Sequence, residues 1–175
     1  GWFPDLEQLA RQDLSRVKLL WINYPHMPTG ATATNKQLTA LVHFAQKHNI
    51  LLINDNPYSF ILSNNPTSLL SIPGAKTCAL ELNSISKTFN MAGWRVGMLL
   101  GNAENINAVL KVKSNMDSGM FYGIQKGAIA ALLSSPQWFS TQNATYAKRK
   151  QLIHQLADKL GCPYTPTTAG LFVWC

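Results

Sequence analysis

Three short apolar runs in the first half of the chain, each followed directly by polar, turn-forming residues, place the strongest limit on how this sequence can fold. The runs cover residues 17–22, 50–54 and 77–82, and lengths of this kind are typical of buried strands. A helical pattern over 34–48 separates the first two, so strand, helix and strand follow within about forty residues, the length of one β-α-β unit. Such a unit joins parallel strands by a right-handed crossover. The pattern therefore predicts a parallel α/β sheet.

The helices show their own start and stop signals. Thr34 and Gln37 have the spacing of a capping box, which predicts a helix that ends near His48. Ser135 followed by Pro136 predicts a second N-terminus, with a long helix that runs to residue 160 before a glycine. Apolar spacing predicts the other elements, which are helices over 4–16, 105–116 (capped by Asn102) and 122–133, and a strand over 96–100.

Composition and charge exclude several classes of protein. A length of 175 residues favours one domain with a real core, and 46% hydrophobic against 13% charged residues excludes a disordered chain. The formal net charge of +7 raises the question of nucleic-acid binding. However, the basic residues are scattered, their densest cluster is 148–150, and no zinc-finger spacing or aromatic RNA-binding signature accompanies them. We expect no nucleic-acid partner, although the positive charge favours anionic ligands.

The cysteines and the apolar runs indicate in which cellular compartment the protein is expected. Cys78, Cys162 and Cys175 are odd in number and lack Cys-x-x-Cys spacing, which argues against a disulfide framework and against a metal site. No apolar run approaches the roughly eighteen residues of a membrane span. The first residues lack the basic start and apolar core of a signal peptide. We therefore expect a cytoplasmic protein with no membrane partner.

The stretch 84–97 after the third apolar run carries the residues best suited to chemistry. Lys87 is preceded by the hydroxyls of Ser84 and Ser86 and is followed eight residues later by Arg95. Lysine amines form Schiff bases with carbonyl groups, while hydroxyls and the planar guanidinium bind phosphate oxygens. A single lysine near a turn is more often a solvated charge, so the neighbouring residues must decide.

Polar residues also follow the other two runs. Asp55 and Tyr58 come after the second run, and residues 23–30 come after the first. In an open parallel sheet, ligands bind at the carboxyl ends of the strands. Each residue also has an ordinary structural explanation, because aspartates cap turns, tyrosines are often half-buried and arginines are often surface charges.

Taken together, these motifs resemble the large domain of the class I and II aminotransferases, fold type I among the enzymes that use pyridoxal 5′-phosphate. The resemblance is strongest over residues 23–95 and weaker from there to 175. It implies a three-layer α/β fold with a mostly parallel sheet and helices on both faces. It also implies that 1–160 is part of the cofactor-binding large domain, and that 161–175 is the truncated start of the small C-terminal domain, with a strand over 168–174.

The resemblance assigns the catalytic roles by position. Lys87 matches the lysine that forms the Schiff base with the cofactor and then moves the α proton of the substrate. Asp55 matches the carboxylate that holds the pyridine nitrogen in its protonated form, without which the ring is no electron sink. Tyr58 matches the phenol that bonds to the ring oxygen of the cofactor. The phosphate ligands by the same matching are Ser84 and Arg95, with Ser86 as a third candidate.

One position departs from the family pattern. The asparagine that normally precedes Pro-Thr-Gly is replaced by Met27, whose thioether is a weak acceptor with no hydrogen to donate. Tyr58 would then remain as the main donor to the cofactor's ring oxygen, unless His26 compensates. We therefore expect an active enzyme in which the pKa of the lysine–cofactor linkage is altered.

The leading functional hypothesis is an aminotransferase that moves an amino group from an amino acid to a 2-oxo acid and forms a homodimer at full length. Lyase or decarboxylase chemistry on the same scaffold is one alternative. A non-enzymatic regulatory module with an aminotransferase-like domain is another, and the presence of Lys87, Asp55, Tyr58 and Arg95 favours the enzyme. The family's glycine-rich and ring-stacking segment and its substrate-binding arginine have no counterpart here, so we expect a fragment that is inactive alone.

Overall fold

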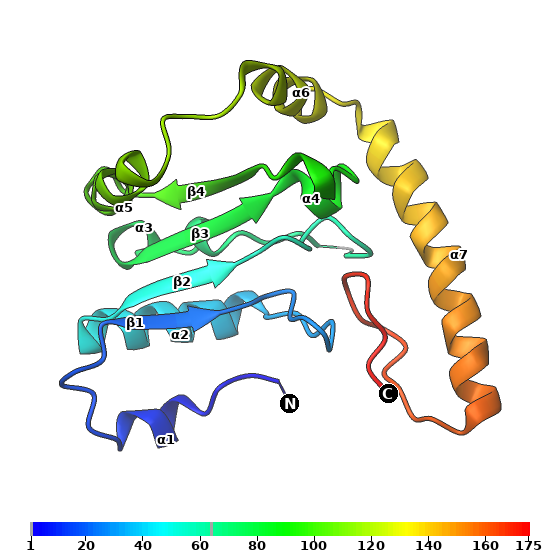
Figure 1. Ribbon diagram of the computed structural model, residues 1–175. Coiled ribbons are helices and arrows are strands. Elements are labelled where there is room, and N and C mark those ends of the chain that lie inside the picture. The colour runs from blue at the N-terminus through cyan, green and yellow to red at the C-terminus, as the bar shows by residue number, and fades with distance from the viewer. Residues whose placement is uncertain (1, 64) are drawn as a thin grey trace.

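The computed structural model describes residues 2–63 and 65–175, and Gly1 and Asn64 lie outside the described residues. Four strands form one sheet in the order β1-β2-β3-β4 (Figure 1). Strands β1, β2 and β3 are parallel, and β4 is antiparallel to β3. The expected α/β fold with a mostly parallel sheet is confirmed. The strands are β1 (Leu19–Ile22), β2 (Leu51–Asp55), β3 (Ala79–Ser84) and β4 (Gly97–Gly101).

The helices begin and end where the sequence signals are strongest. The capping box is present, since Thr34 Oγ1 accepts from the Gln37 amide at 3.2 Å and Gln37 Oε1 accepts from the Thr34 amide at 2.9 Å. None of the helices in the described residues is long and apolar enough to cross a membrane. The helices are α1 (Leu6–Ala10), α2 (Asn35–His48), α3 (Ala75–Cys78), α4 (Ile85–Thr88), α5 (Ala103–Met116), α6 (Tyr122–Leu132) and α7 (Pro136–Leu160), with 3-10 turns at Leu69–Ser71 and Ala92–Trp94.

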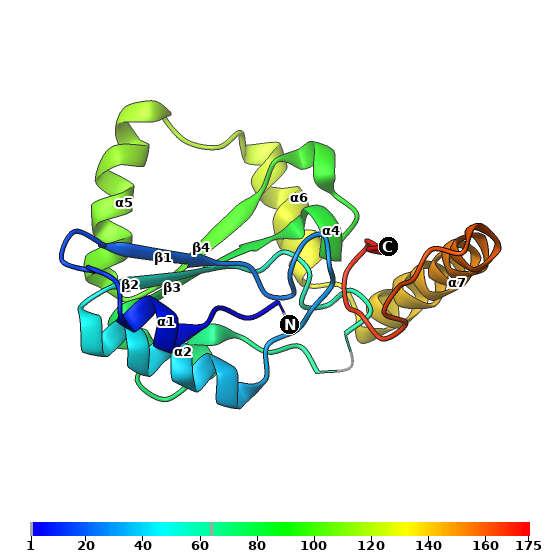
Figure 2. The same cartoon turned by 90° about the horizontal axis from the view of Figure 1, so that it is seen from below.

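The main core lies between the sheet and α2. Leu41 of α2 and Leu52 of β2 are fully buried, and Ile22 and Ala79 extend the same apolar layer across β1 and β3. The opposite side of the sheet carries α5, as the view from below shows (Figure 2). Helices therefore lie on both faces of the sheet, as expected.

The α5 side of the sheet is less well covered than the α2 side. Leu19 and Trp21 of β1 are 54% and 58% exposed, and α5 buries none of its own residues. The best-packed part of this side lies near α4, where Ala128 of α6 contacts Ile85 and Val96. Apolar burial thus concentrates on the α2 side and near the turn that carries Lys87.

The segment after α7 turns back to the loops at the carboxyl ends of the strands (Figure 1). The amide of Ala169 donates to the carbonyl of Gly30 at 2.9 Å, and that of Gly170 donates to Ile61 at 2.8 Å. The strand expected over 168–174 is wrong, because these bonds go to two different loops and the segment forms no strand within the described residues. A ladder needs a continuous partner strand, which these loops do not provide.

Several other boundaries differ from those expected, among them the start of the first strand, which is Leu19 and not residue 17. The first helix ends at Ala10 and does not continue to residue 16. Farther along, the Asp13 carboxylate accepts from the Ser15 amide at 3.0 Å, a local turn that competes with helix. The third strand begins at Ala79, because Thr77 belongs to α3.

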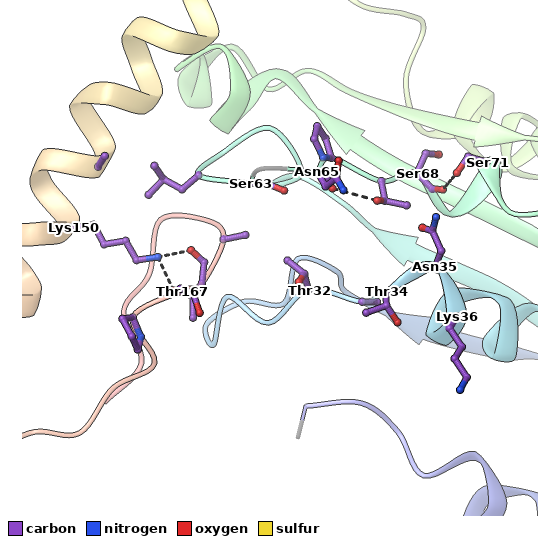
Figure 3. Close-up of a pocket in the computed structure, with 18 of the residues that line it drawn as sticks. Thr32, Thr34, Asn35, Lys36, Ser63, Asn65, Ser68, Ser71, Lys150 and Thr167 are labelled. Carbon is purple, nitrogen blue, oxygen red and sulfur yellow. Dashed lines mark hydrogen bonds between the residues drawn. The ribbon is translucent and has the colours of Figure 1, made fainter.

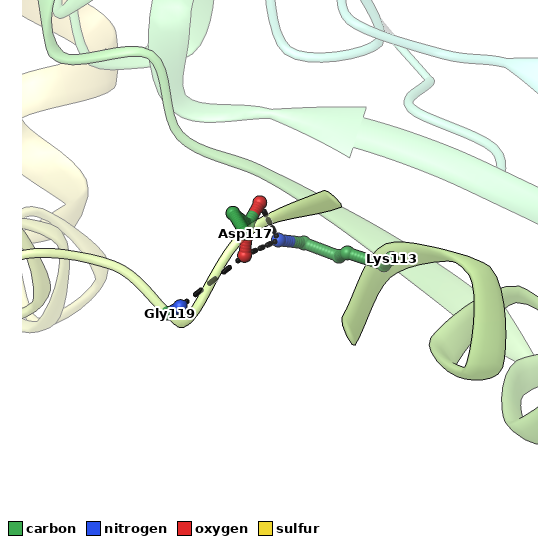
Figure 4. Close-up of polar contacts among 3 residues, drawn as sticks. All are labelled: Lys113, Asp117 and Gly119. Atoms are coloured by element: carbon green, nitrogen blue, oxygen red, sulfur yellow. Dashed lines mark hydrogen bonds and ion pairs between the residues drawn. The ribbon is translucent and has the colours of Figure 1, made fainter. Parts of the chain in front are cut away.

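An exposed ion pair lies at the C-terminal end of α5 (Figure 4). Lys113 Nζ lies 2.6 Å from Asp117 Oδ2, and the Gly119 amide donates to Asp117 Oδ1 at 3.3 Å. The side-chain hydrogen bond from Lys113 lowers the pKa of the Asp117 carboxyl. An exposed pair at this spacing contributes little to stability.

Candidate functional site

The carboxyl ends of β1, β2 and β3 meet at one edge of the sheet. Ile22 pairs with Asn54, and Asp55 pairs with Leu82, so the loops that leave these strands start side by side. Asp55 is the last residue of β2, and Lys87 lies in the short helix that follows β3 directly. The structure therefore brings the candidate carboxyl and the candidate amine to the same edge, on neighbouring strands.

The turn that carries Lys87 is built by Ser84. Its side chain accepts from the Ser86 amide at 3.0 Å and donates to the Val96 carbonyl at 3.2 Å, which ties the start of α4 to the start of β4. Arg95 adopts a left-handed backbone with φ of 55°, and its exposed guanidinium donates to the Ala92 carbonyl at 2.9 Å. Ser84, Ser86, Lys87 and Arg95 thus belong to one compact loop.

Asp55 and Tyr58 form the other side of the site. Burial raises the pKa of the half-buried Asp55 carboxyl. Burial and, to a smaller extent, the charge of Asp55 raise the pKa of the Tyr58 phenol. The Asp55 carbonyl accepts from Asn23 Nδ2 at 2.5 Å, which ties β2 to the loop after β1. Across the part of the chain that the structure describes, neither Lys87 nor Arg95 forms an ion pair and the Asp55 carboxylate has no hydrogen-bond donor.

Met27 contacts the candidate phenol. The Tyr58 hydroxyl lies 3.5 Å from the Met27 sulfur, and the Met27 amide donates to Asn23 Oδ1 at 2.7 Å. His26 does not reach Tyr58 by any described hydrogen bond; its Nδ1 lies 2.7 Å from Thr29 Oγ1, and its ring stacks on Trp2. A thioether is a weak acceptor, so the phenol keeps its proton available for a better partner.

Substitution of Met27 with asparagine is a test of this contact. An asparagine amide would donate to the ring oxygen of the cofactor, which is also the expected acceptor of the Tyr58 hydroxyl. A hydrogen bond donated to the charged form of a group favours that form. We expect Met27→Asn to shift the pH midpoint of the bound cofactor's visible absorbance, measured by titration of the complete protein. An unchanged midpoint would show that position 27 does not tune the cofactor, and Met116→Asn, on the exposed end of α5, is the control.

Helix α7 braces both halves of the site through contacts that the sequence pattern did not indicate. Gln142 Nε2 donates to the Lys87 carbonyl at 3.0 Å, and Trp138 Nε1 donates to the Thr88 carbonyl at 3.1 Å. Asn143 holds the loop after Tyr58, because its Nδ2 donates to the Phe60 carbonyl at 3.0 Å. These partners are 50 to 83 residues apart in the sequence, a separation that no local pattern reveals.

A cavity of about 1290 Å³ lies elsewhere, between the start of α2, residues 62–63 and 65–71, α7 and the C-terminal segment (Figure 3). Lys150 lies at its edge and donates to Thr168 Oγ1 at 2.6 Å, and burial lowers the pKa of this lysine. None of the six candidate cofactor residues lines the cavity. We place the candidate site at the strand ends, because Asp55 and the helix that carries Lys87 follow neighbouring strands at that edge. No group of metal-binding side chains occurs among the described residues at either place.

Comparisons with known proteins show which proteins this chain is similar to. A family model described as aminotransferase class I and II matches residues 1–175. LL-diaminopimelate aminotransferase 2 of Trichormus variabilis is 42% identical, over 99% of this chain and 45% of its own length. LL-diaminopimelate aminotransferase of Aquifex aeolicus is 36% identical over 99% of this chain. The solved structure of BacF from Bacillus subtilis superposes with a TM-score of 0.94 at 37% identity, over 100% of this chain and 45% of that one. The chain thus spans less than half the length of these relatives.

Proposed function

Because this chain belongs to the class I and II aminotransferases, we propose that it forms part of the cofactor site of a pyridoxal phosphate-dependent enzyme that transfers an amino group from an amino acid to a 2-oxo acid. The observation that carries this proposal is the placement of Asp55 and Lys87 at the same edge of neighbouring parallel strands. We propose residues 1–160 as part of the large domain and 161–175 as the start of the small one.

The residues at this edge suit the proposed cofactor. Asp55 is a half-buried carboxyl without a hydrogen-bond donor in the described residues, and a protonated ring nitrogen would supply the missing partner. The hydroxyls of Ser84 and Ser86 and the guanidinium of Arg95 would hold the phosphate. When bound, pyridoxal phosphate supplies an electron sink for the electrons released at the substrate's α carbon. Lys87 Nζ would attach to the cofactor aldehyde and later carry the α proton.

We also propose a substrate, an oligomeric state and a cellular compartment for the complete protein. The relatives from Trichormus variabilis and Aquifex aeolicus are named LL-diaminopimelate aminotransferases, so LL-diaminopimelate is the first amino donor to test. A homodimer is proposed for the complete protein, meaning the full product of the reading frame that contains this chain. The three cysteines are free thiols, which supports a reducing, cytoplasmic compartment.

Borohydride labelling tests the cofactor assignment directly. The complete protein is mixed with pyridoxal phosphate, reduced, digested and mapped by mass spectrometry. We expect the label on the peptide that contains Lys87. Lys150 is the strongest competitor, because its lowered pKa increases the fraction of free amine. Label on Lys150, or no label, would contradict the assignment; Lys150→Arg is the control and should leave the label on Lys87.

A further inference from the structure

The middle of β3 contains a buried acid that the proposed chemistry does not use. Glu81 is 3% exposed, and no lysine, arginine or histidine forms an ion pair with it in the described part of the chain. Its carboxylate is satisfied by neutral donors instead. Oε1 accepts from Asn56 Nδ2 at 2.7 Å, from Asn54 Nδ2 at 3.2 Å and from the Leu69 amide at 3.3 Å, and Oε2 accepts from the Ser68 hydroxyl.

A buried carboxylate at this position lowers the stability of the fold unless its partners compensate. Burying a charged group costs free energy, because the group gives up its hydration, and at Glu81 hydrogen bonds from neutral donors offset that cost. Glu81 therefore requires a reason beyond core packing. Its two asparagine partners supply one, because they stand immediately before and immediately after Asp55.

The alternation of side chains along β2 explains what this arrangement does. Residues two apart on a strand point to the same face, so Asn54 and Asn56 reach Glu81 on the α2 side and Asp55 points to the other side. Asn54 also accepts from the Tyr24 amide at 3.0 Å, and Asn83 Nδ2 donates to the Asn56 carbonyl at 2.9 Å. The backbone on both sides of Asp55 is thus held in place.

We infer that Glu81 is a positioning residue of the cofactor site, which fixes the direction of the Asp55 carboxyl by anchoring Asn54 and Asn56 on the opposite face of the sheet. This inference rests on the proposed function for its consequence in catalysis. The anchoring itself does not require the cofactor, so it is tested separately in the complete protein without cofactor.

The test compares Glu81→Leu with Glu81→Gln. Leucine removes the acceptor, whereas the glutamine oxygen can accept from both asparagines while its amide faces Ser68, which has lone pairs to accept. The first readout is the pKa of Asp55, from carbon-13 NMR of the complete protein without cofactor. We expect Glu81→Leu to lower this pKa toward that of an ordinary carboxyl, because Asp55 is released to solvent, and Glu81→Gln to keep the wild-type value.

The second readout uses the complete protein with pyridoxal phosphate. Loss of a residue that holds a ligand-binding side chain in place typically weakens binding by about tenfold or more. We therefore expect Glu81→Leu to raise the cofactor Kd about tenfold or more, and Glu81→Gln to change the Kd less than about threefold. Glu81→Leu should also shift the pH midpoint of the cofactor's absorbance. Leu41→Ala, a cavity variant in the same core, controls for general loss of stability and should leave the midpoint and the Asp55 pKa unchanged.

Each other outcome overturns the inference. Equal shifts of the Asp55 pKa in both Glu81 variants would show an effect of charge and not of position, and no shift in either would show no anchoring. A shift of equal size in Leu41→Ala would show general loosening. If Glu81→Leu does not fold, Asn56→Ala removes one anchor with Glu81 intact and should lower the Asp55 pKa. A wild-type protein that binds no cofactor would refute the proposed function, while the NMR result would still decide on Glu81.

Discussion

Transamination by the complete protein is expected to fall by at least about a thousandfold when Lys87 is replaced with alanine, because the variant loses its only proposed proton carrier. The same substitution removes the covalent attachment, so borohydride should leave no label on the peptide around position 87. Turnover is measured with LL-diaminopimelate and a 2-oxo acid, and retention of the label is measured by mass spectrometry.

The Lys87 experiment has a matched control. Lys111 is an exposed lysine on α5, and Lys111→Ala should retain both turnover and label. A Lys87→Ala protein that keeps more than about a hundredth of wild-type turnover is incompatible with a general-base role, which is worth about a hundredfold or more. Retained secondary structure in circular dichroism separates this result from unfolding.

The second large effect is expected at Asp55, where asparagine should act in opposite directions on function and on fold. Loss of a preorganised charge partner at a reacting group typically costs about 10²–10³ in rate, and we expect Asp55→Asn to fall in that range. Without the cofactor, the same substitution is expected to stabilise the fold and not to weaken it. Burial raises the pKa of Asp55, so its ionised form is the costly one near neutral pH.

The pH dependence of stability follows from that raised pKa. A group whose pKa is higher in the folded state contributes stability that is present at low pH and is lost as the pH rises through the folded-state pKa. Asp55 therefore disfavours the cofactor-free fold near pH 7, and Asp55→Asn should unfold at the same or a higher temperature than the wild type. Thermal melts at several pH values measure this, with Glu104→Gln on the exposed surface of α5 as the control. A clear drop in melting temperature would show that Asp55 has a structural partner.

Local signals in the sequence identified much of the fold. Thr34 with Gln37 gave the start of α2, Pro136 gave the start of α7, and the apolar runs gave the parallel strands, since each signal acts within a few residues of the element. The strand expected over 168–174 failed for the opposite reason. An apolar, β-prone segment becomes a strand only when another strand lies beside it, and pairing is not encoded locally.

Some residues of the candidate site could likewise be predicted from the sequence, and others could not. Asp55, Tyr58 and Lys87 could be predicted as site residues, because polar residues at strand ends follow from the chain order and from the resemblance. Trp138 and Gln142 were not found, because they approach the site from α7 through contacts with backbone carbonyls, which any hydrogen-bond donor can make. Glu81 was missed because a single acid within an apolar run carries no signal of what it binds. Its role depends on two asparagines 25 and 27 residues away.

The sparse cover over β1 has a practical consequence for work with the 175-residue chain. β1 ends the strand order of the sheet, and its outward side chains include the largely exposed Leu19 and Trp21. A strand with one open row of backbone donors and acceptors and with bare apolar side chains is a template for adding further strands from other molecules. Purification of these residues alone therefore favours aggregation, and light scattering at several protein concentrations should accompany every spectroscopic measurement made on them.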